Sequence, residues 1–180
     1  MNDTTTMTNT DTLTSTDVDL LVAYMADEEA SQRDLLEKLE RKEECLVRQD
    51  LDALQQCLAE TEPIVARLEA CTRRRVRILR AIGGRLGVDP EEIRVATLVS
   101  RAPAGDRRRL EEAREKLRDV LARIGRQNRR NHVLIKNGIE VNDALVRALF
   151  GGGEEAPRTY DRSARGRPLP QTRSYLNQEL

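Results

Sequence analysis

The chain has 180 residues, of which 38% are apolar, 34% charged and only 2% aromatic, and its 31 basic residues balance its 31 acidic ones. The zero net charge argues against general binding of polyanions, and no apolar run approaches the ~20 residues that cross a bilayer as a helix. The sequence does not show the pattern of a signal peptide, which is a basic segment followed by an apolar stretch, so we expect a cytoplasmic protein.

The start of the chain divides into a leader and a helix. Residues 1–16 include eight threonines and few apolar side chains. Such a segment buries too little surface to offset its ordering entropy, so it is predicted to be a disordered leader. Residues 17–48 repeat apolar side chains in steps of three and four, which predicts a helix with Thr16 or Asp17 as its N-cap.

A second helix is expected to follow directly, with Asp50 as its N-cap. Pro63 lies inside this helix, where the missing amide hydrogen and the ring should cause a kink or a short break. Gly83, Gly84 and Gly87 are expected to end the helix, because glycine tolerates a positive φ.

Two further helices are predicted beyond these glycines. The pair Asp89-Pro90 is a helix start signal and should open a short helix that runs to about Val99. Residues 107–150 contain no proline and predict one long helix, with Asp106 as its cap.

These elements predict an all-α fold with one domain over residues 17–150. Its expected form is an elongated antiparallel helical hairpin and a third long helix in a coiled-coil-like bundle, with one short helix added. Residues 151–180 hold three prolines and scattered polar residues, and they are predicted to be a flexible C-terminal tail.

Charge is segregated along the chain although it sums to zero. Residues 17–62 carry 14 acidic and five basic side chains, whereas residues 63–85 and 101–130 are both rich in arginine. An acidic first helix that packs beside basic partners would explain this pattern and would direct the pairing of the helices. The alternative is a nucleic-acid site on Arg73-Arg74-Arg75-Val76-Arg77 or on Arg107-Arg108-Arg109, but this reading lacks stacking aromatic residues and a known module.

The residues that could carry chemistry are few. His132 is the only histidine, and Lys136 and Gly138 follow it at spacings that do not fit a histidine phosphotransfer domain. No nucleophile with its base, no pair of carboxylates and no nucleotide loop can be assembled, so we predict that the protein is not an enzyme. Three cysteines at long spacing are expected to be free thiols, and we predict no metal, no other cofactor and no small-molecule substrate.

The last long helix carries two features that point to helix pairing. Asn128, Asn131 and Asn142 fall on or near its apolar seam, where asparagines can fix the register between helices. Beyond residue 133 the apolar side chains widen into a band, formed by Leu134, Ile135, Ile139, Val141, Leu145, Val146, Leu149 and Phe150. One neighbouring helix would not cover this band. The short helix or a second copy could pack there, or the band could be a groove for an amphipathic helix of a partner.

Several short motifs resemble the FlgN family of flagellar export chaperones over residues 18–170. These motifs are Glu28-Glu29, Leu35-Leu36, Leu51-Asp52-Ala53-Leu54, Leu86-Gly87, Asn128-x-x-Asn131, and the tail sequence Thr159-Tyr160-Asp161 with Gly166 beyond it.

The resemblance implies a chaperone of the flagellar type III export apparatus. Its clients would be the hook-associated junction proteins, whose amphipathic C-terminal helices it would cover to prevent premature assembly. The band in the last helix would then be the client-binding groove, and Tyr160 would dock on the cytoplasmic domain of the export gate. A structural coiled-coil protein that self-associates, for instance as a homodimer, is the main alternative, and a nucleic-acid adaptor is the third.

Overall fold

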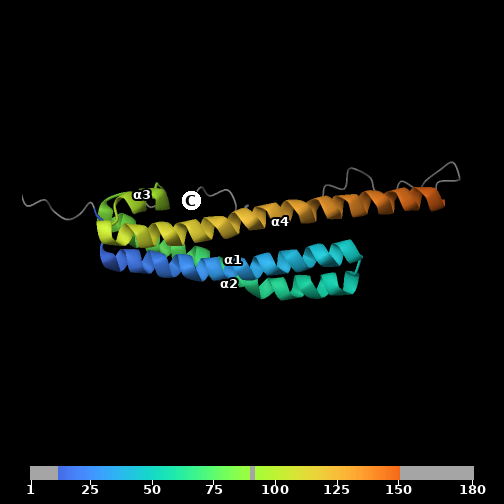
Figure 1. The fold of residues 1–180 in the computed structure, drawn as a ribbon, viewed down its shortest axis with the longest axis horizontal. Coiled ribbons are helices and arrows are strands. Elements are labelled where there is room, and N and C mark those ends of the chain that lie inside the picture. The colour runs from blue at the N-terminus through green and yellow to red at the C-terminus, as the bar shows by residue number, and fades with distance from the viewer. Residues whose placement is uncertain (1–11, 90–91, 151–180) are drawn as a thin grey trace, which may run out of the picture.

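The fold was obtained as a computed structural model that describes residues 12–89 and 92–150. This part of the chain contains four helices and no strand. The helices are α1 (Ser15–Arg48), α2 (Leu51–Leu86), α3 (Val95–Ser100) and α4 (Ala104–Phe150). Figure 1 shows three long helices along a common direction, with α3 at the end where α4 begins. The predicted all-α class and elongated helical bundle are therefore confirmed.

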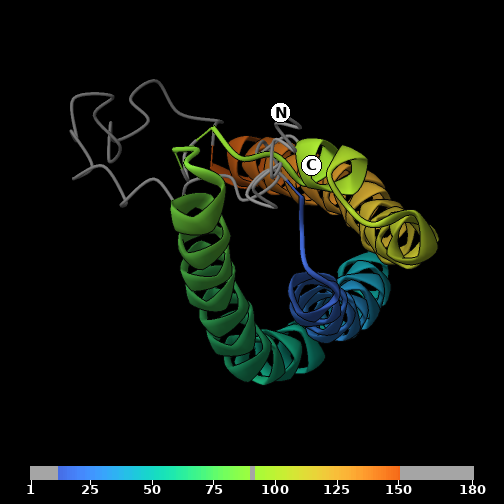
Figure 2. The same ribbon diagram turned by 90° about the vertical axis from the view of Figure 1, so that its left-hand side faces the viewer.

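The central helix of the bundle is α1. It packs against both α2 and α4, whereas α2 and α4 make little contact with each other. Viewed from one end, α1 lies between its two neighbours (Figure 2). The hairpin of α1 and α2 is antiparallel. The α4 helix runs parallel to α1, because Arg109 pairs with Asp19 near the starts of these helices and Asn131 bonds to Leu39 further along both.

The first helix begins earlier than its sequence pattern suggested. Thr14 is the N-cap: its hydroxyl accepts from the amide of Asp17, and the Asp17 carboxylate accepts from the amide of Thr14 at 2.8 Å. Leu13 is only 2% exposed, and its amide donates to the carbonyl of Arg101 at 2.9 Å. Neither Thr16 nor Asp17 is the cap, and of residues 12–16 only Leu13 is buried in the core of the bundle. Residues 1–11 of the expected leader lie outside the described residues.

A two-residue turn joins α1 to α2. Gln49 adopts a left-handed conformation with φ 57°, and the amide of Asp50 donates to the carbonyl of Cys45 at 3.0 Å. This is the pattern of a Schellman C-cap. The Asp50 carboxylate then accepts from the amide of Ala53 at 2.9 Å, which confirms Asp50 as the N-cap of α2.

The second helix is continuous through Pro63, so the proline does not break it. One proline removes a single backbone hydrogen bond, and the packing of α2 along α1 supplies the compensating contacts. Gly83 and Gly84 also lie within the helix, and only Gly87, with φ 64°, ends it. The expected role in ending the helix is therefore confirmed for Gly87 and wrong for Gly83 and Gly84, which occupy helical positions.

The short helix α3 begins at Val95, later than the Asp89-Pro90 signal suggested, and Arg94 caps it without a side-chain hydrogen bond. Residues 90–91 lie outside the described residues. The last helix begins at Ala104, and Asp106 lies in its first turn rather than at its cap.

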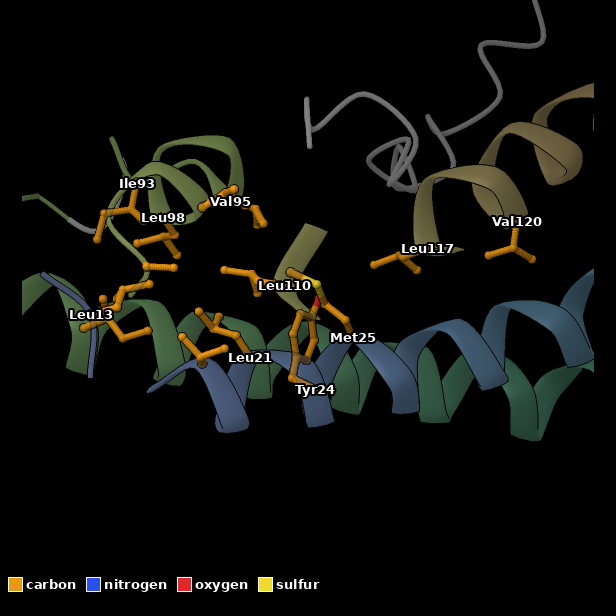
Figure 3. Packing of buried hydrophobic residues seen from close by; sticks show 14 of the residues in the cluster. Leu13, Leu21, Tyr24, Met25, Ile93, Val95, Leu98, Leu110, Leu117 and Val120 are labelled. Atoms are coloured by element: carbon orange, nitrogen blue, oxygen red, sulfur yellow. The ribbon is translucent and has the colours of Figure 1, made fainter. Parts of the chain in front are cut away.

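The core is thickest at the end where α3 lies. Leu21, Tyr24 and Met25 of α1 meet Leu98 of α3 and Leu110 of α4 there (Figure 3). All five are at most 2% exposed. From this end the core continues between α1 and α4, where Leu117, Val120 and Ile124 are buried, and Cys57 and Ile64 of α2 are buried as well. Within the described residues, none of the helices is apolar over a length that could cross a membrane.

Candidate functional site

Ion pairs between helices account for the segregated charge. They link α1 to both neighbours, and arginines supply Arg67–Asp34, Arg74–Asp27 and Arg85–Asp17 from α2, and Arg109–Asp19 and Arg123–Glu40 from α4. In two further pairs the charges are reversed, because Lys38 and Arg41 of α1 bind Glu60 of α2. Each exposed pair contributes at most about 1 kcal/mol, but together they favour this arrangement over a shifted one. The prediction that an acidic first helix packs beside basic partners is confirmed.

The arginine runs are largely engaged by the protein itself. In the first run, Arg74 pairs with Asp27. In the second, Arg108 pairs with Glu112 at 2.8 Å, and Arg109 bonds to Asp19 at 2.8 Å. A nucleic acid would have to compete with these carboxylates, which weakens the nucleic-acid reading.

Two carboxyl groups of α1 have shifted pKa values. Burial raises the pKa of Glu28 above its ordinary value, and the nearby Arg75 offsets only part of this effect. The hydroxyl of Tyr24, itself 2% exposed, donates to the Glu28 carboxylate. Burial acts in the same direction on Asp17, but hydrogen bonds from Arg85 and Thr14 outweigh it and lower the pKa of Asp17.

A buried polar pair on α4 anchors it to α1. Asn131 is 3% exposed, and its amide nitrogen donates to the backbone carbonyl of Leu39 at 2.9 Å. One turn earlier, Gln127 is 5% exposed and donates to the Glu43 carboxylate. Gln127 also lies 3.4 Å from the amide oxygen of Asn131. The polar pair therefore joins one face of α4 to the backbone and a side chain of α1.

Only one of the three candidate register asparagines makes such a contact. Asn131 is buried, whereas Asn128 and Asn142 are exposed. The partner in the buried pair is Gln127, which the sequence reading did not select. Its position four residues before Asn131, on the same helical face, was the signal that could have identified it.

Residues 132–150 of α4, which we call the α4 extension, lie beyond the polar pair. Figure 1 shows that α4 continues past the turn between α1 and α2. Every residue of the extension is exposed except Leu134, which is half-buried. Ile139 is 57% exposed, Leu145 54% and Leu149 75%. The candidate client-binding residues therefore lie on a helix that no other described element covers.

This arrangement differs from two of the expectations for the apolar band. The short helix α3 packs against the start of α4, at the opposite end, so it does not cover the band. Within the described residues, the band is also not the floor of a groove, because no second helix walls it. What α4 presents is one convex amphipathic face.

The apolar face of the extension continues the face that packs on α1. Leu117, Ile124 and Asn131 follow one another at seven-residue spacing and are all buried against α1. The same spacing reaches Leu145, and Ile135 lies one turn beyond Asn131. A helix advances by about 100° per residue, so these positions share one side of α4. The extension therefore has the kind of surface that packs on a neighbouring helix, but no described helix covers it.

An elongated helical bundle with one uncovered amphipathic helix has a surface of the kind on which a further helix packs. The model of the FlgN family, described as "FlgN protein", matches residues 17–167 of this chain. Because the match covers most of the chain, the chain belongs to the FlgN family. Membership implies a role as a flagellar export chaperone, and the family is one of chaperones rather than of enzymes. Neither the curated proteins nor the solved structures gave a match.

Tyr160, the candidate residue for docking on the export gate, lies outside the described residues. It does lie within the segment that the FlgN family model matches.

Proposed function

We propose that this protein is a cytoplasmic flagellar export chaperone that binds the amphipathic C-terminal helices of hook-associated proteins with its α4 extension. Covering these helices would prevent premature assembly of the client. The chaperone would then deliver the client to the export gate, with Tyr160 docking on the gate's cytoplasmic domain.

The observation that carries this proposal is the uncovered apolar face of the extension. Leu145, Val146 and Leu149 are 54%, 56% and 75% exposed, although the same side of α4 is buried upstream. Transferring such surface from water into a helix–helix contact is favourable by roughly 25 cal/mol per Å². An amphipathic client helix has the matching surface, and it would lose that exposure at the same time.

The proposed role of the tail rests on chemistry. A tyrosine in a polar segment offers a large apolar ring with one hydroxyl, which suits it as an anchor in a protein interface. If the tail orders only on docking, part of the interaction energy is used for that ordering, which suits a complex that must release its cargo.

The test replaces two apolar residues of the extension. The double change Leu145→Asp and Leu149→Asp should weaken binding of a labelled peptide, taken from the C-terminal helix of a hook-associated protein of the same genome, by about 100-fold or more. The measurement is fluorescence anisotropy with the full chain. Circular dichroism should show unchanged helicity, because neither residue contacts another described element.

The matched control is the double change Asn137→Asp and Ala144→Asp, which adds the same charge to the same exposed segment but outside the apolar face. It should leave the affinity for the peptide within about twofold. Tyr160→Ala should also leave the affinity unchanged while it weakens binding to the gate domain. Equal affinity of the Leu145/Leu149 variant and the wild-type chain for the peptide would refute the proposed binding face.

A further inference from the structure

We infer that the bound client helix lies in line with α1, as if α1 continued beyond its turn, and that Asn142 hydrogen-bonds to it. This inference rests on the proposed function and adds the position of the client and a residue that recognises it.

The uncovered face of the extension lies on the same side of α4 that packs on α1 upstream. Upstream, the side of α4 that carries Ile124 and Asn131 packs on α1, and downstream the same side is uncovered. The interface between α1 and α4 therefore does not end because the surface of α4 changes. It ends because α1 stops at Arg48 and the chain turns into α2. A helix that continued along the axis of α1 would find the same kind of surface.

The end of α1 also has an exposed apolar residue on the side that faces α4. Glu40 pairs with Arg123 at 3.5 Å, and Glu43 accepts from Gln127, so these two residues face α4. Val47 follows Glu43 by one turn on the same side of α1, yet it is 65% exposed. The end of a client helix that lies in line with α1 would contact this apolar side chain.

An asparagine recurs on the same side of α4 in the buried part and in the extension. Asn142 lies 11 residues after Asn131, which is close to three full turns of an α-helix, so the two share one side of α4. Asn131 donates to the backbone carbonyl of Leu39 in α1. Asn142 is exposed and has no hydrogen-bond partner among the described residues. A helix in line with α1 would present a carbonyl or a polar side chain to Asn142, as α1 does to Asn131.

The charges of the extension indicate which chemistry the client helix should have. The charged residues of the extension past Leu134, namely Lys136, Glu140, Asp143 and Arg147, all fall outside its apolar face. The contacting side of the client helix should therefore be uncharged. Residues 135–150 span about 24 Å, which accommodates roughly four turns of a client helix.

The experiment compares two asparagines of the extension in the full chain, with the same labelled client peptide as probe. Asn142→Asp removes the donor and would bury a carboxylate in the complex, so we expect at least a tenfold weaker affinity. Asn137→Asp adds the same charge outside the apolar face, and we expect affinity within twofold of the wild-type chain. Lowering the pH until the carboxyl group is protonated should restore binding of the Asn142→Asp variant, because a protonated carboxyl can donate.

A photo-crosslinking residue then tests the position. Placed at Val47 it should crosslink to the peptide, and placed at Leu20, an exposed apolar residue near the start of α1, it should not. Equal affinities of the two aspartate variants, or crosslinking from Leu20 rather than Val47, would overturn the inference. So would a wild-type dimer that the Leu145→Asp and Leu149→Asp changes dissociate, because a second copy would then occupy the face.

If the wild-type chain does not bind the peptide at all, the proposed function itself fails. If it binds through Leu145 and Leu149 but without Asn142 or Val47, only this inference fails.

Discussion

At the scale of single residues, the bundle depends on a few polar groups at fixed positions. The asparagines of α4 show why residue type alone does not reveal such a group. Asn128 and Asn131 are three residues apart on the same helix, yet only Asn131 reaches α1. The sequence places both near the seam, but the width of the contact with α1 decides which of them is buried.

This contrast yields a prediction for stability. Asn131→Ala should lower the free energy of unfolding by about 1 to 2 kcal/mol, because it removes the bond to Leu39 and one neighbour of Gln127 in a buried site. Asn128→Ala, at an exposed site, should change it by less than about 0.5 kcal/mol. Urea denaturation of both variants measures the difference. Equal losses for the two alanine variants would contradict the anchoring role of Asn131.

Asp17 makes stability depend on pH. Its folded-state pKa lies below the ordinary value of 3.8, so below that pH the unfolded chain binds more protons than the folded one. The stabilisation is therefore complete above this value and is lost as the pH falls through the lowered pKa. Asp17→Asn, which retains an acceptor for Thr14, should flatten this acid limb. Denaturation midpoints followed from neutral to acid pH test the effect, and an acid limb as steep as that of the wild-type chain would contradict it.

At the scale of helices, the periodic pattern predicted the existence and type of the elements better than their ends. All four helices were expected, but α2 has no break at Pro63 and does not end at Gly83 or Gly84. The start of α3 was misplaced because the Asp89-Pro90 signal is local, whereas the helix forms where Val95 and Leu98 can be buried. Local signals were reliable at the short turn, where Asp50 caps α2 as predicted.

The extension is the element whose independence can be tested directly. A chain that ends after Leu134 should keep the urea midpoint of the full-length protein, because residues 135–150 of α4 are exposed in the described structure. The same truncation should abolish binding of the client peptide. A large fall in the midpoint would mean that the extension supports the bundle.

At the scale of the whole molecule, the arrangement of the helices follows from their charges and from their relative lengths. The acidic α1 lies between two helices that pair with it through arginines, and this could be predicted from the segregation of charge. The apolar band of the candidate site could also be predicted from its composition. That it lies on one free helix, beyond the end of α1, could not, because it depends on α4 being longer than the hairpin beside it.

The most direct test of the proposed function is hydrogen–deuterium exchange of the full chain with and without the client peptide. The free chain should exchange quickly over residues 135–150 and slowly where α4 packs on α1, because exposed helical turns open without disturbing the core. Saturating peptide should slow exchange in the extension and leave α2 unchanged. Protection of α2 instead of the extension, or no protection of α4 at all, would contradict the assignment of this face to the client.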